Sequence, residues 1–323
     1  MRNKKAVVLT ILICLVILSA ILSLSYGKSL TAVWRGFFES DGFGLILKKI
    51  RLPRTIIAFL VGGSLGICGV VLQSILQNPL ADPYTLGISG GAALGITLSA
   101  LLGMQMYLGI YASPLMGFAG ATASVLIVYA LSKRRFFNPT NMVLFGIVTN
   151  LVFSSLVFFL FSIMDPDKMQ TTLMWIMGDL LTLDVSLVPF YIPMFVLPAL
   201  VLCFFGKELD LLSLGSEKAH YLGLNPPRAY KFLFLITSFL TGLCVSAAGI
   251  IGFVGLVVPH VLRNVAGAGH SFLLLSSFLG GAFFLIVSDV ICRYLLYPVE
   301  LPVGVVTGIT GGLILLVLLL RRP

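Results

Sequence analysis

Few charged side chains fall inside the apolar runs of this sequence, and they limit the chemistry open to it. Asp289 is the only acidic residue well inside an expected membrane helix, and Arg293 follows four residues later, the spacing at which side chains meet on one helix face. Ion-coupled carriers usually hold acidic or His residues within their spans. A proton relay through Asp289 alone is therefore disfavoured, and an Asp289–Arg293 pair is expected.

The other reactive side chains stand singly. His260 follows Pro259 in a glycine-rich run, with no second His or carboxylate placed to share a metal with it. The cysteines are scattered through apolar segments, at Cys14, Cys68, Cys203, Cys244 and Cys292. Paired carboxylates, an H-E-x-x-H motif and a placed nucleophile are absent from the sequence. We therefore expect no metal site, no cofactor and no enzymatic activity.

Gly27-Lys28-Ser29 resembles the end of a phosphate-binding loop. The earlier glycine that this motif requires would fall at Leu22, and no strand precedes it. The match is accidental, and the chain has no nucleotide site of its own. If the protein drives uphill transport, a separate ATPase must bind to it.

The composition is that of a polytopic membrane protein. Of the 323 residues, 59% are hydrophobic and 10% are charged, with a mean hydropathy of +1.08, which leaves too little polar surface to solvate a soluble domain. The formal net charge of +9 would suggest nucleic acid in a soluble protein. In a membrane protein a basic excess usually lies in cytoplasmic loops, so no nucleic-acid partner is expected.

Apolar runs of about 20 residues predict ten membrane-spanning helices in an all-α fold. They lie near residues 6–25, 55–76, 84–103, 107–131, 141–163, 185–205, 230–248, 250–262, 271–291 and 303–320. The first is too long for the apolar part of a signal peptide, and the eighth is short and glycine-rich. Spans two to five and seven to ten would be sets of opposite orientation, as in an inverted repeat. A single transmembrane domain, 1–323, is expected.

An even number of spans puts both termini on one side. With the termini inside, thirteen of the 21 Lys and Arg residues fall on internal segments and eight on external ones, which favours cytoplasmic termini. Six of the eight lie between Lys28 and Arg54, an external basic cluster that opposes the rule and needs its own explanation. The external loops, about 26–50 and 165–184, are long enough to carry short helices.

The largest internal loop, about 206–229, is the only sizeable cytoplasmic feature. Ser216 is placed to cap a short helix, and Gly223 is placed to end it. The pattern predicts two short helices that are broken at Gly215 and lie across the membrane face. Such a segment is either a plain connector or a docking element for a cytoplasmic partner.

The second span is uncharged from Thr55 to Leu76 and carries glycines on one face, at Gly62, Gly66 and Gly69. Small residues in this pattern let another helix approach closely. A turn with two prolines follows at residues 77–83, and further glycines then begin another helix, at Gly87, Gly91 and Gly95.

Four segments resemble the permeases of type II ATP-binding-cassette (ABC) importers, the FecCD-like family for iron-siderophores, haem and vitamin B12. They are RLPR at residues 51–54, residues 77–92, GFVGLVVPH with Arg263 at residues 252–263, and ELPVG at residues 300–304. The resemblance implies a homodimer of ten-helix subunits. It places this homodimer in the cell membrane, or the inner membrane, of a bacterium or archaeon. It also implies two cytoplasmic ATPase subunits and an extracytoplasmic substrate-binding protein.

The resemblance also assigns site residues. Docking of the binding protein falls to Arg51, Arg54 and Arg293. Coupling to the ATPase falls to Leu212, Gly215, Glu217, Lys218, Ala219, His220, Leu222 and Gly223. The inner gate falls on Asn78, Leu80, Thr140 and Asn141, although Asn138-Pro139 departs from the family's gate pattern and leaves the register open. Thr149 and Asn150 either line the path or bond to a neighbouring helix.

We therefore interpret the chain as a permease subunit that moves an iron complex, a ferric siderophore first of all, by alternating access. Haem, cobalamin and an oxyanion are the alternatives within this class. A stand-alone secondary carrier or channel is the alternative from a different class, and the missing intramembrane charge disfavours it.

Overall fold

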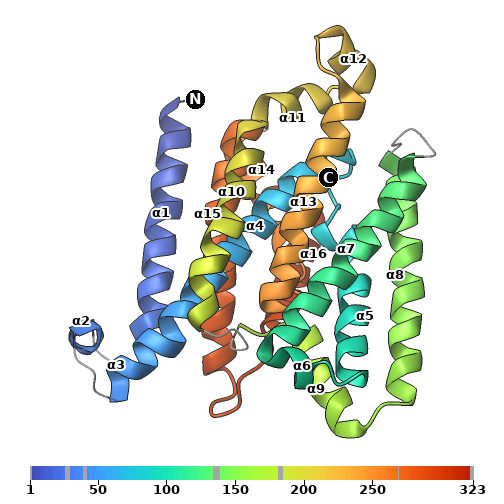
Figure 1. The fold of residues 1–323 in the computed structure, drawn as a ribbon. Coiled ribbons are helices and arrows are strands. Elements are labelled where there is room, and N and C mark those ends of the chain that lie inside the picture. The colour runs from blue at the N-terminus through green and yellow to red at the C-terminus, as the bar shows by residue number, and fades with distance from the viewer. Residues whose placement is uncertain are drawn as a thin grey trace.

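The computed structural model describes residues 2–25, 30–38, 42–133, 139–180, 185–267 and 269–320. Within these ranges every regular element is a helix, and the long helices form one bundle (Figure 1). Eight helical segments are long and apolar enough to cross a membrane, and two shorter apolar helices join them. The all-α fold with ten spans is confirmed.

The ten spans follow the predicted order. They are α1 (Arg2–Ser25), α4 (Leu52–Ile75), α5 (Ile88–Leu101), α7 (Ala112–Lys133), α8 (Pro139–Ser162), α10 (Val188–Phe204), α13 (Pro226–Ala248), α14 (Val254–Ala266), α15 (His270–Tyr294) and α16 (Val303–Leu320). Short elements connect them: α2 (Leu30–Phe38), α3 (Gly42–Ile46), the π-helical turn η1 (Leu47–Arg51), η2 (Pro83–Leu86), α6 (Gln105–Leu108), η3 (Gly109–Tyr111), α9 (Pro166–Ile176), η4 (Val185–Leu187), α11 (Gly206–Leu212) and α12 (Ser216–Tyr221).

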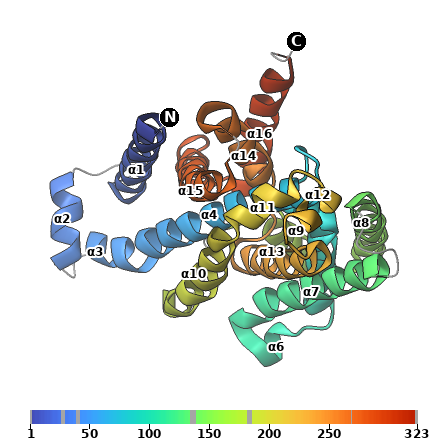
Figure 2. The ribbon, with the colours of Figure 1, turned by 90° about the horizontal axis from the view of Figure 1, so that it is seen from above.

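Helix α4 crosses the middle of the bundle and is buried almost along its whole length (Figures 1 and 2). Its glycine face confirms the predicted close packing. A methyl group on Gly62 or Gly66 would collide with backbone carbonyls of α15, and one on Gly69 would collide with Gly255 of α14. Because these glycines carry only a hydrogen atom as a side chain, the backbone of α4 lies in direct contact with the backbones of α14 and α15.

The third and eighth spans begin later than predicted. Residues 84–86 belong to the 3-10 turn η2, and α5 begins only at Ile88, because Gly87 adopts the left-handed φ of 79°. Helix α14 begins at Val254, after Phe253 at φ 68°. The two interruptions touch, since the backbone N–H of Ile251 donates to the Tyr84 hydroxyl at 3.2 Å.

The two halves of the chain exchange partners. Helix α4, the second span, packs on α14 and α15, which are the eighth and ninth spans. Helix α13, the seventh span, packs on α5 and α7, which are the third and fourth. The first helix of each four-span set thus packs against the other set. The short interrupted spans α5 and α14 occupy equivalent places in the two sets, as an inverted repeat requires.

Gly66→Ala is expected to lower the melting temperature of the purified protein. The new methyl group would meet the Ser277 carbonyl, and overpacking of this kind costs about 1–3 kcal/mol. Gly308→Ala on α16 is the matched control, because a methyl group there meets nothing within 4 Å. Equal melting temperatures for the two variants would contradict the close packing of α4 on α15.

Candidate functional site

The predicted coupling segment projects beyond the bundle at the end where α1 begins (Figure 1). It forms two short helices, α11 and α12, broken at Gly215 with φ 102°, as predicted. The predicted cap is wrong. Ser216 is already the first helical residue, Gly215 occupies the N-cap position, and no side chain caps the helix.

The residues assigned to ATPase coupling divide by burial. Leu212 and Ala219 are fully buried and hold the segment against the bundle. The exposed set is Glu217, Lys218, His220, Leu222 and Gly223, with Tyr221 beside them. Tyr221 and Leu222 are 80% and 61% exposed, so apolar surface projects from a segment that carries charged neighbours.

The predicted gate residues lie in a turn and at a helix start. In the turn after α4, Asn78 accepts the Leu80 N–H at 2.9 Å, and Leu80 is 45% exposed. Thr140 and Asn141 lie in the first turn of α8, which begins at Pro139, while Asn138 falls outside the described residues. Helix α8 meets the chain beyond the turn at Gly146, which packs on the backbone of residues 85–86.

The same turn ends in a half-buried carboxylate. Asp82 accepts the Tyr84 N–H at 2.9 Å and so caps η2. Burial raises the pKa of Asp82 to about 6, although hydrogen bonds from the backbone of Tyr84 and Phe253 oppose the rise. One carboxylate therefore ties the turn to the interruption before α14.

Asn150 both bonds to a neighbouring helix and lines a cavity. Its side-chain oxygen accepts the Gly90 N–H at 2.9 Å and the Ser89 hydroxyl at 3.1 Å, at the start of α5. The cavity has a volume of about 390 Å³ and is lined by Ser154 and Phe158 among others, whereas Thr149 is buried. Its walls are therefore apolar with a few hydroxyl and amide groups.

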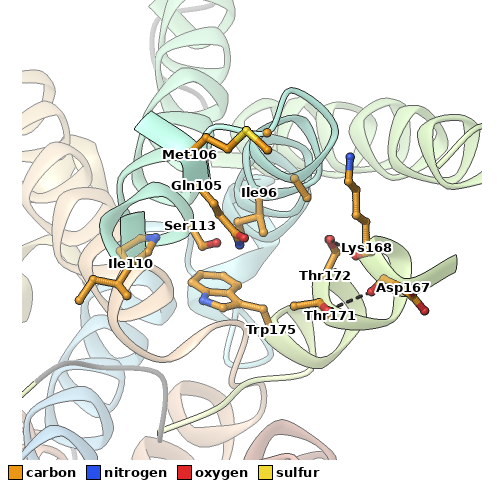
Figure 3. Close-up of a pocket in the computed structure, with 13 residues that line it drawn as sticks. Ile96, Gln105, Met106, Ile110, Ser113, Asp167, Lys168, Thr171, Thr172 and Trp175 are labelled. Carbon is orange, nitrogen blue, oxygen red and sulfur yellow. Dashed lines mark hydrogen bonds between the residues drawn. The ribbon is translucent and has the colours of Figure 1, made fainter. Parts of the chain in front are cut away.

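A second cavity of about 470 Å³ lies between the last turns of α5, the first turn of α7 and the short helices α6 and α9. Figure 3 shows the Trp175 ring below Ile96 and Ser113, with Asp167 and Lys168 on the α9 side. The next residue, Ile176, lines the cavity of Asn150. Helix α9 thus forms a wall between the two cavities.

Two of the three predicted docking arginines converge on one buried carboxylate. Asp289 is fully buried and accepts Arg54 Nε at 2.6 Å through one oxygen and Arg293 Nη2 at 2.7 Å through the other. Arg54 also reaches Glu300 at 2.7 Å, and Arg293 reaches the Ser23 hydroxyl at 2.7 Å. The expected Asp289–Arg293 pair is present, within a larger cluster that we call the outer ionic cluster.

The outer ionic cluster has one accessible side. Arg54 and Arg293 are each 5% exposed, but the carboxylate-bearing side chain of Glu300 is 41% exposed. Arg54, Asp179 and Glu300 line a small cavity of about 110 Å³. Sequence reasoning missed Ser23 and Glu300, because partners more than 240 residues apart from Arg54 and Arg293 leave no local pattern.

Arg51 lies one turn before Arg54, at the end of η1. Its Nη1 donates to the Leu24 carbonyl at 2.9 Å, and its guanidinium lies 5.2 Å from the centre of the Phe43 ring. The side chain is only partly buried, and Lys48 and Lys49 lie in the same turn. Of the three predicted docking residues, Arg51 is therefore the most accessible.

The sequence matches the FecCD transport family model over residues 9–321. The chain belongs to this family. It is 36% identical to the hemin transport system permease HmuU of Yersinia pestis, covering 99% of this chain and 97% of the relative. It is also 36% identical to the Fe(3+) dicitrate permease FecD of Escherichia coli, covering 91% and 92%. The fold matches a metal-chelate type ABC transporter solved in an inward-facing conformation, with a TM-score of 0.86 and 28% identity over 98% of this chain and 100% of that one.

This FecCD permease is thus a multi-pass membrane protein of the ABC importer class, with the fold of type II importer permeases. The residues that carried the resemblance occupy the places just described. The RLPR motif leads into α4, the turn at residues 77–83 follows α4, and ELPVG holds Glu300 beside Arg54.

Asp289→Asn is expected to destabilise the permease strongly. Removing one partner of a buried ion pair costs about 3–5 kcal/mol, because the remaining charges stay buried, and here two arginines lose their shared carboxylate. Asp165→Asn is the control, since that carboxylate is 76% exposed and pairs with Lys168 at 3.6 Å. Comparable thermal unfolding of the two variants would show that Asp289 does not hold the cluster.

Proposed function

We propose that this permease imports a ferric siderophore by alternating access, driven by separate ATPase subunits that hydrolyse ATP on its behalf. The observation that carries the proposal is the exposed surface of α12. Tyr221 and Leu222 project from it beside Glu217 and Lys218. Exposed apolar patches rimmed by polar groups mark interaction sites, so the ATPase binds there and its closure moves α11 and α12.

The assembly that we propose is a homodimer with two ATPases on the side of α12 and a binding protein on the side of α2 and α9. Each subunit is a single transmembrane domain, 1–323, with both termini cytoplasmic, in a bacterial or archaeal cell or inner membrane. Apolar side chains on the outer faces of α8 and α16, such as Leu151, Phe158 and Leu313, supply the surface that lipid and the second subunit cover.

The ligand assignment rests on the cavity beside Asn150. Its hydroxyl, amide and apolar lining suits the organic shell of a chelate, in which the ligand already fills the coordination sphere of the iron. Relatives at the same 36% identity are named for hemin and for ferric dicitrate. Overall similarity therefore does not choose between haem and a small chelate, and cobalamin stays a further alternative.

The gate and the docking site complete the proposal. Asn78 and Leu80, together with Thr140 and Asn141, close the inner end of the path, and Asn150 lies along it. On the outer side, Arg51 attracts carboxylates of the binding protein. Arg54 and Arg293 stay paired with Asp289, and a carboxylate of the binding protein takes the place of Glu300 beside Arg54.

Uptake into vesicles that contain the permease, its ATPase and its binding protein should be seen for a labelled ferric siderophore and should require ATP. Leu222→Asp should abolish uptake and binding of the ATPase while leaving the melting temperature unchanged, because this side chain is 61% exposed. Tyr107→Asp is the control, at a side chain 84% exposed on α6. Accumulation of haem or cobalamin instead would refute the siderophore, and uptake without any ATPase would refute the importer.

Arg51→Glu should slow association of the binding protein by about tenfold at low salt, because long-range steering depends on the sign of surface charge. The difference from the native permease should shrink at high salt, where charges are screened. Lys168→Glu makes the same change in net charge on α9 and should have a smaller effect. Association rates that do not differ between Arg51→Glu and the native protein would exclude Arg51 from docking.

A further inference from the structure

A chain of hydrogen bonds joins the coupling segment to the inner end of α4. Asp210 of α11 accepts His270 Nδ1 at 2.6 Å and the His270 backbone N–H at 3.0 Å, both on one oxygen. His270 Nε2 lies 2.7 Å from the Ser74 hydroxyl, in the last turn of α4. We call these three residues the inner relay.

The inner relay has an ordered set of donors and acceptors. The Ser74 hydroxyl donates its one hydrogen to the Val70 carbonyl at 2.8 Å, so its oxygen is left to accept from His270 Nε2. An ionised Asp210 can only accept, so Nδ1 donates to it. The imidazole therefore bridges the two helices, with Nδ1 bonded to Asp210 and Nε2 bonded to Ser74.

The residue types are those of a hydrolase triad, but the surroundings are not. Ser74 is 5% exposed, and its hydroxyl hydrogen is bonded to its own helix. A nucleophile needs an open approach and a base that accepts its proton. The hydrogen bond of Ser74 within its own helix therefore favours a mechanical connection over a catalytic site.

The inner relay joins the segment before α12 to the turn after α4. Asp210 lies six residues before Ser216, where α12 begins, and Ser74 lies four residues before Asn78 of the gate turn. A second bond joins the same two regions, since the Gln77 side chain reaches the Leu212 carbonyl at 3.5 Å. Gly206, the first residue of α11, also packs directly on the backbone of Ser271.

The relay borders a hollow that leaves α12 room to move. A cavity of about 510 Å³ lies beside it, lined by Gln77, Pro79, Leu214, Arg263 and His270 among others. Leu214 and Gly215, which lead into α12, therefore border open space, whereas Asp210 is held by its hydrogen bonds to His270. Motion of α12 can then reach the bundle through the contact between Asp210 and His270.

We propose that His270 is a positioning residue that transmits movement of α11 and α12 to the inner end of α4, and so sets the position of the turn at residues 77–83. This inference rests on the proposed function, in which the ATPase moves α12. A plainer role is also open to Asp210, which accepts the first N–H of α15 and so stabilises that helix. The experiment must separate transmission from stability.

In the reconstituted importer, His270→Ala, Ser74→Ala and Asp210→Ala should each raise the number of ATP molecules hydrolysed per substrate imported by about fivefold, the lower end of typical coupling between sites. Asp210→Ala and Ser74→Ala should each change nothing further in a His270→Ala background, because both act through the imidazole. Thr97→Ala is the matched control, since that buried hydroxyl donates to the Ala93 carbonyl of its own helix at 2.7 Å. Unchanged ratios, or effects that add, would overturn the relay.

A second measurement needs no transport and uses the permease alone. Spin labels at the exposed Leu214 and Leu80, in a background without accessible cysteines, should give one narrow distance distribution in the native protein and in Thr97→Ala. The distribution should broaden in His270→Ala. Equal distributions would refute the mechanical connection even if uptake works, whereas broadening without any ATP-driven uptake would refute only the proposed function.

Discussion

The structure depends on how closely α4 approaches α15. Without water in the hydrocarbon core, helices associate by close packing and by polar contacts, and the glycines of α4 bring its backbone against carbonyls of α15. Helix α4 has 24 residues and is therefore about 36 Å long, so its two ends reach the two faces of the protein. What is attached at one end is rigidly related to what is attached at the other.

The same two helices are also joined by polar contacts at both ends. At the outer end, Arg54 of α4 meets Asp289 of α15. At the inner end, Ser74 of α4 meets His270 of α15. A helix pair that is held at both ends and packed through its middle is built to move as one body. In the alternating access that we propose, this pair therefore rotates against α5, α7 and α8 and does not slide within itself.

The sequence could predict whatever is local or periodic. Ten spans, the helix break at Gly215 and the Asp289–Arg293 pair follow from hydropathy, glycine and the i, i+4 spacing. The starts of α5 and α14 could not be predicted, since positive φ at Gly87 and Phe253 depends on tertiary contacts. Nor could the partners of Arg54, because Asp289 and Glu300 lie 235 and 246 residues away. The inner relay could not be predicted from the sequence for the same reason, because its three residues come from three separate helices.

In the docking that we propose, the outer ionic cluster lets a buried arginine take part. Asp289 has both oxygens engaged and no exposed surface, so it stays with Arg54 and Arg293. Glu300 is the partner that can leave, since it is 41% exposed and accepts from Arg54 Nη1 at 2.7 Å. Replacing one carboxylate by another keeps the buried charge compensated throughout. Docking by exchange at Glu300 therefore avoids the cost of uncovering an arginine, and it would pass a displacement of Arg54 directly into α4.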